Sequence, residues 1–309
     1  MKRIFIFLLL VIYMASLTSC ADKEPEAGEI TVTDDLGNSF SIKADAKAAA
    51  CHGSLADAWQ LSGGTVGAVT RDAIDEHGLK FDTQPSIIGS VKEIDLEALV
   101  GAGCDYVLLS LDLTAHRKLS GKLSELGLAF GYFRLDSFSD YKSVMERFCE
   151  VNGGDEAFYK NVTVPEANIT KILQLCSECD TKESVLLIRA YSGGIKAKAQ
   201  DNLAGVILEE LGIHNIANDN PSILEDISYE YIIEKDPDRI LVLTMGDEAA
   251  ALAELRASLL DHPAMAELTA IKDGRVTILP KELFHYKPNE RFDESYEFIA
   301  KIFFPEIEQ

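Results

Sequence analysis

The sequence predicts an α/β protein of two lobes, each built on a mostly parallel sheet, with a long helical segment between them. Short apolar runs such as "DYVLLS" and "SVLLIRAYS" alternate with helical stretches in both halves of the chain. Strands that are apolar on both faces are typical of parallel sheets covered by helices. The chain is 309 residues long, which exceeds one ordinary domain and favours two.

An internal repeat supports the division into two halves. The segment that begins at Ile94 aligns without gaps with the segment that begins at Ile227. In both copies a glutamate, Glu97 or Glu230, precedes by eight residues an aspartate that opens an apolar strand. Two copies of helix, turn and buried strand at equivalent places predict two lobes of similar construction.

The first residues have the features of an export signal. Two basic residues precede an apolar run over residues 4–14, which is about half the roughly 20 residues that a membrane span needs. The sequence "LTSC", ending at Cys20, resembles the lipobox of bacterial lipoproteins, whose cysteine carries the lipid after cleavage. We therefore expect a signal peptide over residues 1–19, a lipidated Cys20 and a flexible tether over residues 20–29.

The rest of the chain is expected to follow the order lobe, linker, lobe. "EITVTDDLGNSFSIK" alternates around a turn signal and predicts a hairpin at the start of the N-terminal lobe, residues 30–139. Residues 140–180 are mainly helical in pattern and form the predicted linker, which Gly153-Gly154 and Pro165 are expected to break or kink. Strands and helices alternate again over residues 181–309, the predicted C-terminal lobe.

Within each lobe the pattern gives the expected order of elements. "KAAACHG" predicts a strand that leads into a helix from Ser54 to Leu61, and "VGAVT" predicts the next strand. "IDLEALVGAG" and "TAHRKLSGKLSELG" are helical in pattern and alternate with strands. The second lobe repeats this order with the helical "NLAGVILEELG" and the strand "DRILVLT", and it ends in a helix from Asn289 to Phe304.

Charge and cysteine content exclude several classes of partner. The net charge is −22, and removal of Lys2 and Arg3 with the signal makes it −24. A basic footprint for nucleic acid or anionic headgroups is absent, so only the lipid anchor is expected to contact the membrane. The five cysteines after Cys20 lie mostly in apolar contexts and are expected to be small buried residues, although the role of the Cys176 and Cys179 pair stays open.

These pieces, in this order, resemble the substrate-binding lipoproteins of ABC importers for iron-siderophores, haem or cobalamin. "TVTDDLGNSFSI" resembles their opening hairpin, "CHGSLADAWQLSGGTVGAVT" their first strand-helix-strand unit, and "FDESYEFIAKIFFPE" their closing helix. The resemblance covers nearly all of Glu29 to Pro305. It implies two Rossmann-like lobes joined by a backbone helix, with the ligand in the cleft outside the carboxyl ends of the strands. It also implies that Glu97 and Glu230 dock onto arginines of the permease.

Residues at the predicted strand ends are the candidates for ligand contact. They are His52, Ser54, Thr70, Arg71, Ser110, Asp112, Arg189, Tyr191, Met245, His285, Tyr286 and Lys287. A ferric chelate or tetrapyrrole is large, partly apolar and usually anionic, so it needs aromatic walls and a few cations. Arg71, Arg189 and Lys287 are the expected cations, and each arginine is equally compatible with a structural ion pair. His285 and Tyr286 are compatible with an axial ligand to haem iron, but a cleft-lining histidine without metal contact is the simpler reading.

Together these features predict a monomeric binding protein, held by lipid on the outer face of the bacterial cytoplasmic membrane. Its expected partners are an ABC permease and one small-molecule ligand, an iron chelate, haem or corrinoid. No resident cofactor or metal is expected.

Two alternatives stay open. Capture of bare zinc or manganese needs three or four converging ligands, whereas His52, His116, His214 and His285 are scattered along the sequence. An enzyme on the same fold is the other alternative. The sequence has no GxSxG, P-loop, post-strand GxGxxG or HExxH motif to support catalysis, so no enzymatic activity is expected.

Overall fold

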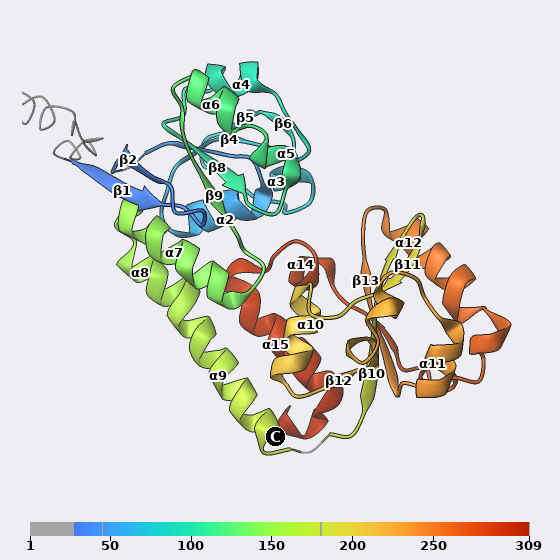
Figure 1. Cartoon of the computed structure of the whole chain (residues 1–309). Coiled ribbons are helices and arrows are strands. Elements are labelled where there is room, and N and C mark those ends of the chain that lie inside the picture. Colours follow the sequence, from blue (N-terminus) through green and yellow to red (C-terminus); the bar gives the residue numbers. More distant parts are fainter. Residues whose placement is uncertain (1–27, 45, 180, 309) are drawn as a thin grey trace, which may run out of the picture.

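The computed structural model of the chain describes residues 28–44, 46–179 and 181–308. Figure 1 shows two α/β lobes connected by helices, so the fold class predicted from the sequence is confirmed. The predicted signal peptide, Cys20 and most of the predicted tether lie outside the described residues. Within the described part, no helix combines the length and the hydropathy that crossing a membrane requires.

The described chain begins with the predicted hairpin. Strands β1 (Glu29–Thr33) and β2 (Ser39–Lys43) pair antiparallel. The buried carboxylate of Asp34 closes the turn, because its Oδ1 accepts two backbone N–H groups of the turn at 2.8 and 2.9 Å. Its Oδ2 accepts the N–H of Tyr132 at 3.1 Å, which ties the hairpin to the sheet of the N-terminal lobe.

A five-stranded parallel sheet in the order β5-β4-β3-β8-β9 forms the N-terminal lobe. Every residue of β3 and β8 is buried, as expected for strands covered on both faces. The strands of this sheet are β3 (Ala48–Ala50), β4 (Val66–Val69), β5 (Ser86–Ile87), β8 (Tyr106–Ser110) and β9 (Ala129–Phe133). A separate antiparallel ribbon consists of β6 (Gly89–Ser90) and β7 (Glu93–Ile94).

Helices of the N-terminal lobe connect these strands. They are α2 (Gly53–Leu61), α3 (Asp72–Asp75), α4 (Leu96–Gly101), α5 (Thr114–Arg117) and α6 (Ser120–Glu125). Helix α2 begins where the His52 side chain accepts the backbone N–H of Ser54, which satisfies one of the free donors of the first turn. On its buried face Trp59 packs edge-on against Phe148 of the linker, with 4.9 Å between the ring centroids.

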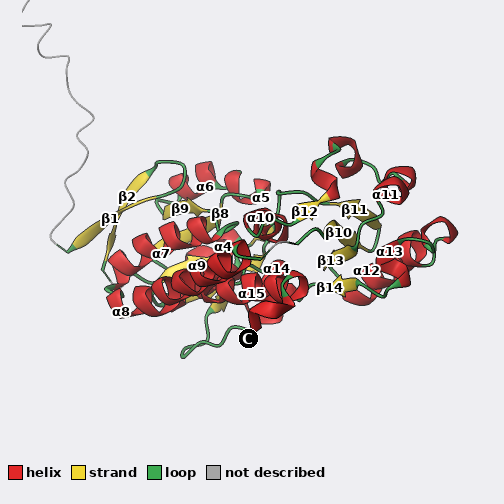
Figure 2. Cartoon of the chain, turned by 90° about the horizontal axis from the view of Figure 1, so that it is seen from below, coloured by secondary structure: helices red, strands yellow, loops and turns green. Residues whose placement is uncertain are grey.

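The linker passes through α7 (Phe138–Asn152), α8 (Asp155–Phe158), a π-helical turn and α9 (Val164–Ser177). Helix α7 ends at Gly153, whose left-handed φ of 66° fits the predicted break. Pro165 does not break the helix, because the π-helical turn Tyr159–Thr163 runs directly into α9. The predicted irregularity takes the form of this π turn just before the proline, where the N–H of Val164 bonds the carbonyl of Tyr159. Figure 2 shows α9 lying beside α15 (Phe292–Phe303), and the two helices are in contact.

The C-terminal lobe holds a second mostly parallel sheet in the order β11-β10-β13-β14, with β12 also paired to β10. Only β11 runs antiparallel to its neighbour, because it forms a hairpin with β10. The strands are β10 (Ser184–Tyr191), β11 (Gly194–Ala197), β12 (His214–Asn215), β13 (Arg239–Thr244) and β14 (Val276–Ile278).

The remaining helices belong to this lobe. They are α10 (Leu203–Glu210), α11 (Tyr229–Lys235), α12 (Glu248–Leu255), α13 (Thr269–Lys272), α14 (Lys281–Phe284) and α15. Short 3₁₀ turns lie at Ile216–Asn218, Pro221–Leu224, Pro263–Met265, Asn289–Arg291 and Pro305–Glu308, and π-helical turns at Tyr159–Thr163 in the linker and Arg256–Leu260 after α12.

The internal repeat has the same structural meaning in both lobes. It corresponds to α4 followed by β8 in one lobe and α11 followed by β13 in the other. Asp105 Oδ2 accepts the N–H of Lys47 just before β3, and Asp238 Oδ2 accepts the N–H of Ser184 at the start of β10. Both bonds are 2.8 Å long. Each aspartate therefore fixes the beginning of the neighbouring strand, which confirms that the halves are built alike.

Apolar packing is continuous from one lobe to the other. A single buried cluster includes Trp59 of the N-terminal lobe, Phe148 of α7, Leu187 of β10 and Phe292 of α15. At its centre the rings of Tyr141 and Phe292 lie 5.6 Å apart. Two further clusters cover the outer faces of the two sheets. The linker is therefore part of a shared core.

Candidate functional site

A pocket of ≈ 350 Å³ lies between the two lobes. Its walls are residues that follow β3, β8 and β9, together with β10, the start of α10 and the segment at the end of α14. The lining residues are His52, Ser110, Asp112, Leu113, Asp136, Arg189, Asp201, Asn202, Leu203, Phe284, His285 and Lys287. The carboxyl ends of strands from both lobes meet here, which is where open α/β sheets bind ligands. A larger groove of ≈ 580 Å³ along α7 and α9 contains no strand residue.

Half of the twelve predicted ligand contacts line this pocket: His52, Ser110, Asp112, Arg189, His285 and Lys287. The other six lie outside its lining: Ser54, Thr70, Arg71, Tyr191, Met245 and Tyr286. Two of these are buried. The Ser54 hydroxyl donates to the backbone carbonyl of Tyr286, and Thr70 has no exposed surface. Arg71, the residue before α3, and Met245 are exposed.

The cations at this pocket differ in whether they already have a partner. Lys287 forms a salt bridge with Asp136, which neutralises it locally. Arg189 projects from β10, and its guanidinium has no hydrogen bond or salt bridge to any residue that the structure describes. An unpaired, half-buried guanidinium is the group in this pocket that is best placed to bind an anionic ligand.

Carboxylates balance these cations. Asp112 lies 3.4 Å from the Arg134 guanidinium, and burial together with the nearby Asp136 raises the pKa of its carboxyl. Asp201 forms a salt bridge with Lys198 at the pocket edge, and it is followed by Asn202, the N-cap of α10. The pocket is therefore polar, and it has groups of both signs.

Aromatic side chains from the end of α14 form the remaining wall. Phe284 and His285 both line the pocket. Burial and the neighbouring Arg189 lower the pKa of His285 to about 4, so its imidazole is neutral at pH 7. A neutral imidazole can accept a hydrogen bond or bind a metal centre.

The segment after α14 also connects the lobes. The Ser54 hydroxyl donates to the carbonyl of Tyr286 at 2.9 Å, and Asn289 Nδ2 donates to Ser54 O at 3.0 Å and Asp57 Oδ2 at 2.7 Å. Lys287 and Asn289 have left-handed φ angles of 62° and 49°. Such angles are uncommon outside glycine, so these contacts hold the segment in a conformation of higher energy.

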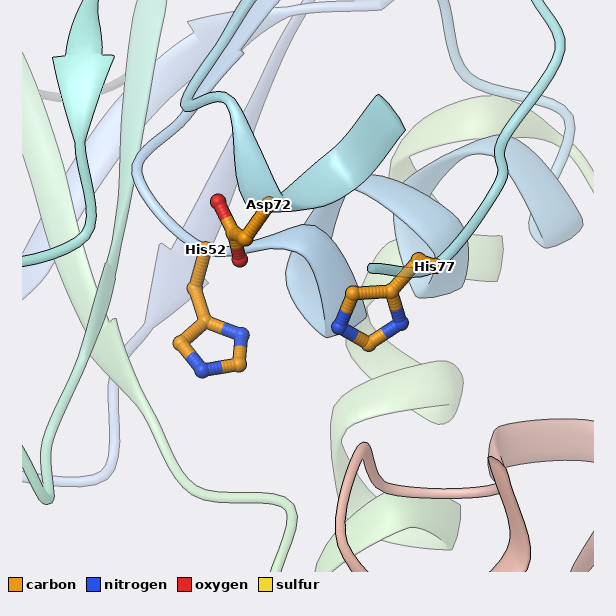
Figure 3. A group of neighbouring side chains, drawn as sticks. All are labelled: His52, Asp72 and His77. Atoms are coloured by element: carbon orange, nitrogen blue, oxygen red, sulfur yellow. The ribbon is translucent and has the colours of Figure 1, made fainter. Parts of the chain in front are cut away.

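A second group of side chains lies on the N-terminal lobe beside the cleft. His52 precedes α2, Asp72 begins α3, and His77 follows α3. One potential ligand atom from each residue lies within 4.8 Å of the others. Figure 3 shows the two imidazole rings on the same side of the Asp72 carboxylate, and the rings lie edge-on to each other. Burial lowers the pKa of both histidines, that of His52 to about 4, although the Asp72 charge opposes the shift.

The expectation that the histidines do not converge is wrong for His52. Its side chain lies close to that of His77, a histidine that the expectation did not include. The expectation holds for His116 and His214. The buried His116 ring bonds the backbone of Ser110 and Val91, and His214 pairs with Asp219 on the surface. It fails for His52, because β3 and β4 are adjacent parallel strands and the loops after them meet.

Sequence reasoning missed other lining residues, some with a detectable signal. Asp136 follows β9 as Asp112 follows β8, so the strand-end rule identifies it once the strand is located. Asp201 and Asn202 come after a hairpin and have no such signal, because β11 turns the chain back before α10 begins.

The two repeat glutamates occupy equivalent places. Glu97 lies in the first turn of α4 and Glu230 in the first turn of α11, and both side chains are exposed. Figure 1 places these helices on different lobes, each far from the linker helix α9.

Comparison with solved structures supports the two-lobed fold. A periplasmic haem-binding protein from Pseudomonas aeruginosa superposes with a TM-score of 0.67 at 18% identity, covering 84% of this chain and 92% of that one. The petrobactin-binding protein YclQ from Bacillus subtilis gives 0.67 at 18% identity, with 89% and 96% covered. The siderophore-binding protein BauB, bound to two acinetobactin molecules and ferric iron, gives 0.70 at 16% identity, with 89% and 98% covered.

Comparison of sequences places the chain in a family. No curated protein sequence matches it significantly. The profile of the family described as "Periplasmic binding protein" matches residues 49–283, which include both sheets and most of the residues at the interlobe pocket. The chain belongs to the periplasmic binding protein family.

Proposed function

We propose that this protein captures a chelated-iron or tetrapyrrole ligand, such as a ferric siderophore, haem or cobalamin, and delivers it to an ABC permease. The observation that carries the proposal is the unpaired guanidinium of Arg189 in a pocket between the lobes of a periplasmic binding protein. The structural relatives whose names state a ligand bind haem or siderophores, which favours the same ligand class.

The pocket has the chemistry that such a ligand needs. Carboxylate or chelating oxygens of the ligand would bind Arg189 through charge-assisted hydrogen bonds, which are about twice as strong as neutral ones. Phe284 and His285 supply an aromatic wall for its apolar part. The volume of ≈ 350 Å³ is near the lower end of the range of about 300–1,000 Å³ for ligand pockets. A large chelate therefore remains partly exposed or moves the lobes slightly apart.

Delivery requires an anchor and a docking surface. We infer that Cys20 carries the lipid and that the mature monomer stays on the outer face of the cytoplasmic membrane. Glu97 and Glu230 are exposed on α4 and α11, one on each lobe, and each would bind a permease arginine. The protein in this proposal binds its ligand and does not transform it.

The test is a thermal-shift and equilibrium-binding screen of the purified chain against haem, cobalamin and ferric siderophores. We expect one class to bind, with Arg189→Ala weakening affinity about ten- to a hundredfold, as expected for loss of a charge-assisted contact of about 1.5–3 kcal/mol. Arg71→Ala is the matched control, because it removes an exposed arginine outside the pocket lining.

Two results would overturn the proposal. The first is a screen in which no chelate or tetrapyrrole binds and only free zinc or manganese stabilises the fold. The second is a bound chelate whose affinity is the same in the wild type and in Arg189→Ala.

A further inference from the structure

The side chains of His52, Asp72 and His77 converge beside the N-terminal end of α2. We propose that they bind one divalent transition-metal ion of the zinc class, at a site that adjoins the chelate pocket and shares only His52 with it. Two imidazoles and one carboxylate form a set that suits zinc and neighbouring first-row metals, with a further position left for water or a ligand oxygen. This proposal does not rest on the proposed function.

Donor atoms without a protein partner support the site. Asp72 is only 6% exposed, and its Oδ2 accepts the N–H of Gly53 at 2.6 Å. Its other oxygen, Oδ1, is buried and has no hydrogen-bond partner among the described residues. A buried carboxylate oxygen without a partner is unfavourable, and a bound cation would satisfy it.

The His77 ring is similarly unused. It makes no hydrogen bond to the described part of the chain, and its ring neighbours are His52 and Tyr286, with centroid distances of 6.1 and 5.5 Å. Either ring nitrogen can therefore act as the ligand atom, and Figure 3 shows the ring directed toward His52 and Asp72.

The His77 ring can come close to Asp72 because Gly53 has no side chain. A Cβ placed on Gly53 would lie 2.3 Å from Cδ2 and 2.9 Å from Nε2 of His77. Any larger residue at the first position of α2 would therefore displace the imidazole from Asp72. This gives a variant that disturbs the site while all three ligands remain.

Metal binding requires a small local rearrangement. Ligand atoms of a tetrahedral zinc ion, with bonds of about 2.0–2.2 Å, lie roughly 3.4 Å apart, so the side chains must close in from separations of up to 4.8 Å. A neutral imidazole has one bare nitrogen, and His52 Nδ1 already accepts the Ser54 N–H at a long 3.2 Å. The ion therefore competes with the cap of α2 for this nitrogen.

The proposed site and the chelate pocket can be tested separately. His52 lines the pocket, whereas Asp72 and His77 do not. Substitutions at Asp72 and His77 should affect the metal ion, and Arg189→Ala should affect the chelate and leave metal binding unchanged.

The experiment is calorimetric titration of the full chain, freed of metal with a chelator, with zinc chloride in the absence of any organic ligand. We expect one equivalent to bind with micromolar or tighter affinity, and cobalt(II) to give the visible absorption of a low-symmetry site. His77→Ala and Asp72→Asn should each weaken zinc binding at least thirtyfold, and Gly53→Ala should weaken it at least fivefold. His214→Ala is the matched control, because it removes a histidine that pairs with one aspartate and has no second histidine.

Circular dichroism of each variant separates loss of the site from loss of the fold. The proposal is overturned if the wild type shows no saturable zinc binding below 100 µM, a limit of roughly −5.5 kcal/mol. It is also overturned if a folded His77→Ala variant binds zinc as tightly as the wild type. A protein that binds zinc but no chelate contradicts the proposed function and leaves the metal site intact.

Discussion

Removing the carboxylate of Glu290 should make the protein more stable at alkaline pH. Glu290 lies in the 3₁₀ turn before α15, and burial together with the charge of Asp57 on α2 raises its pKa from 4.5 to about 7. The pKa of Asp57 is itself raised by burial, and the Asn289 amide opposes the rise. Two carboxyl groups from opposite sides of the lobe junction thus disfavour each other's charged form.

The sign follows from proton linkage. The folded protein holds the Glu290 proton more tightly than the unfolded chain, so this group contributes its full stability below pH 4.5 and loses it as the pH rises to about 7. At about 1.4 kcal/mol per pKa unit, the ionised carboxylate lowers the free energy of unfolding by roughly 3 kcal/mol at pH 8. Solvent at the partly exposed side chain makes this an upper value. Glu290→Gln should therefore raise stability by up to that amount at pH 8 and change little at pH 4.

Urea denaturation at pH 4 and pH 8 measures the effect. Trp59 is the only tryptophan and is fully buried on α2, the helix that carries Asp57, so its fluorescence reports unfolding of this junction. Glu282→Gln is the control, because it removes an exposed carboxylate close in sequence. Equal effects of Glu290→Gln at both pH values, or a loss of stability at pH 8, would refute the reasoning.

Further variants test the anchor, the docking surface and the lobe junction. Cys20→Ala should abolish acylation and cleavage at this position, and a lipidated mature N-terminus in mass spectrometry would contradict the anchor. Glu97→Lys with Glu230→Lys should leave folding and ligand affinity within about 0.5 kcal/mol but abolish uptake through the permease; normal transport would exclude the docking role. Asn289→Ala should lower the free energy of unfolding by about 2–4 kcal/mol in chemical denaturation, because it loses two hydrogen bonds and places alanine at a left-handed φ of 49°. Asn289→Gly also loses the hydrogen bonds but tolerates that φ, so it should lower stability less. Equal losses in the two variants would argue against backbone strain.

Much of the fold could be predicted from the sequence because its signals are local. The hairpin around Asp34, the apolar strand Tyr106–Ser110 and the helix after His52 depend on residues a few positions apart. The repeat was informative for the same reason, since the position of Asp105 relative to its strand recurs at Asp238. In contrast, the effect of a proline depends on where the helix begins. Pro165 follows a π-helical turn inside a continuous helical run, and the sequence pattern alone does not show that the helix continues through it.

The site was less predictable because it depends on which loops meet. The strand-end rule selected Arg189, which lines the pocket. It also selected Lys287, which lines the pocket although it follows helix α14 and no strand, and Arg71, whose chain turns outward into α3. His77 lies after a four-residue helix and has no strand-end position. Only the close approach that Gly53 permits brings it to Asp72.

Two different connections join the lobes, and they should respond differently to ligand. On the linker side, Tyr141 and Phe292 belong to a continuous apolar core, which resists sliding because it is close-packed. The second connection is polar: the bonds of Ser54 and Asn289 are few, each of about 1 kcal/mol net, and they hold a segment with left-handed residues. A small opening about the core would break these polar bonds first. Lys287, in the same segment, lines the pocket, so a ligand that binds it acts on the bonds that set the distance between the lobes. A ligand changes the distance between the lobes only if it binds the open or the closed form more tightly. The segment that carries Lys287 is where this difference in affinity would arise.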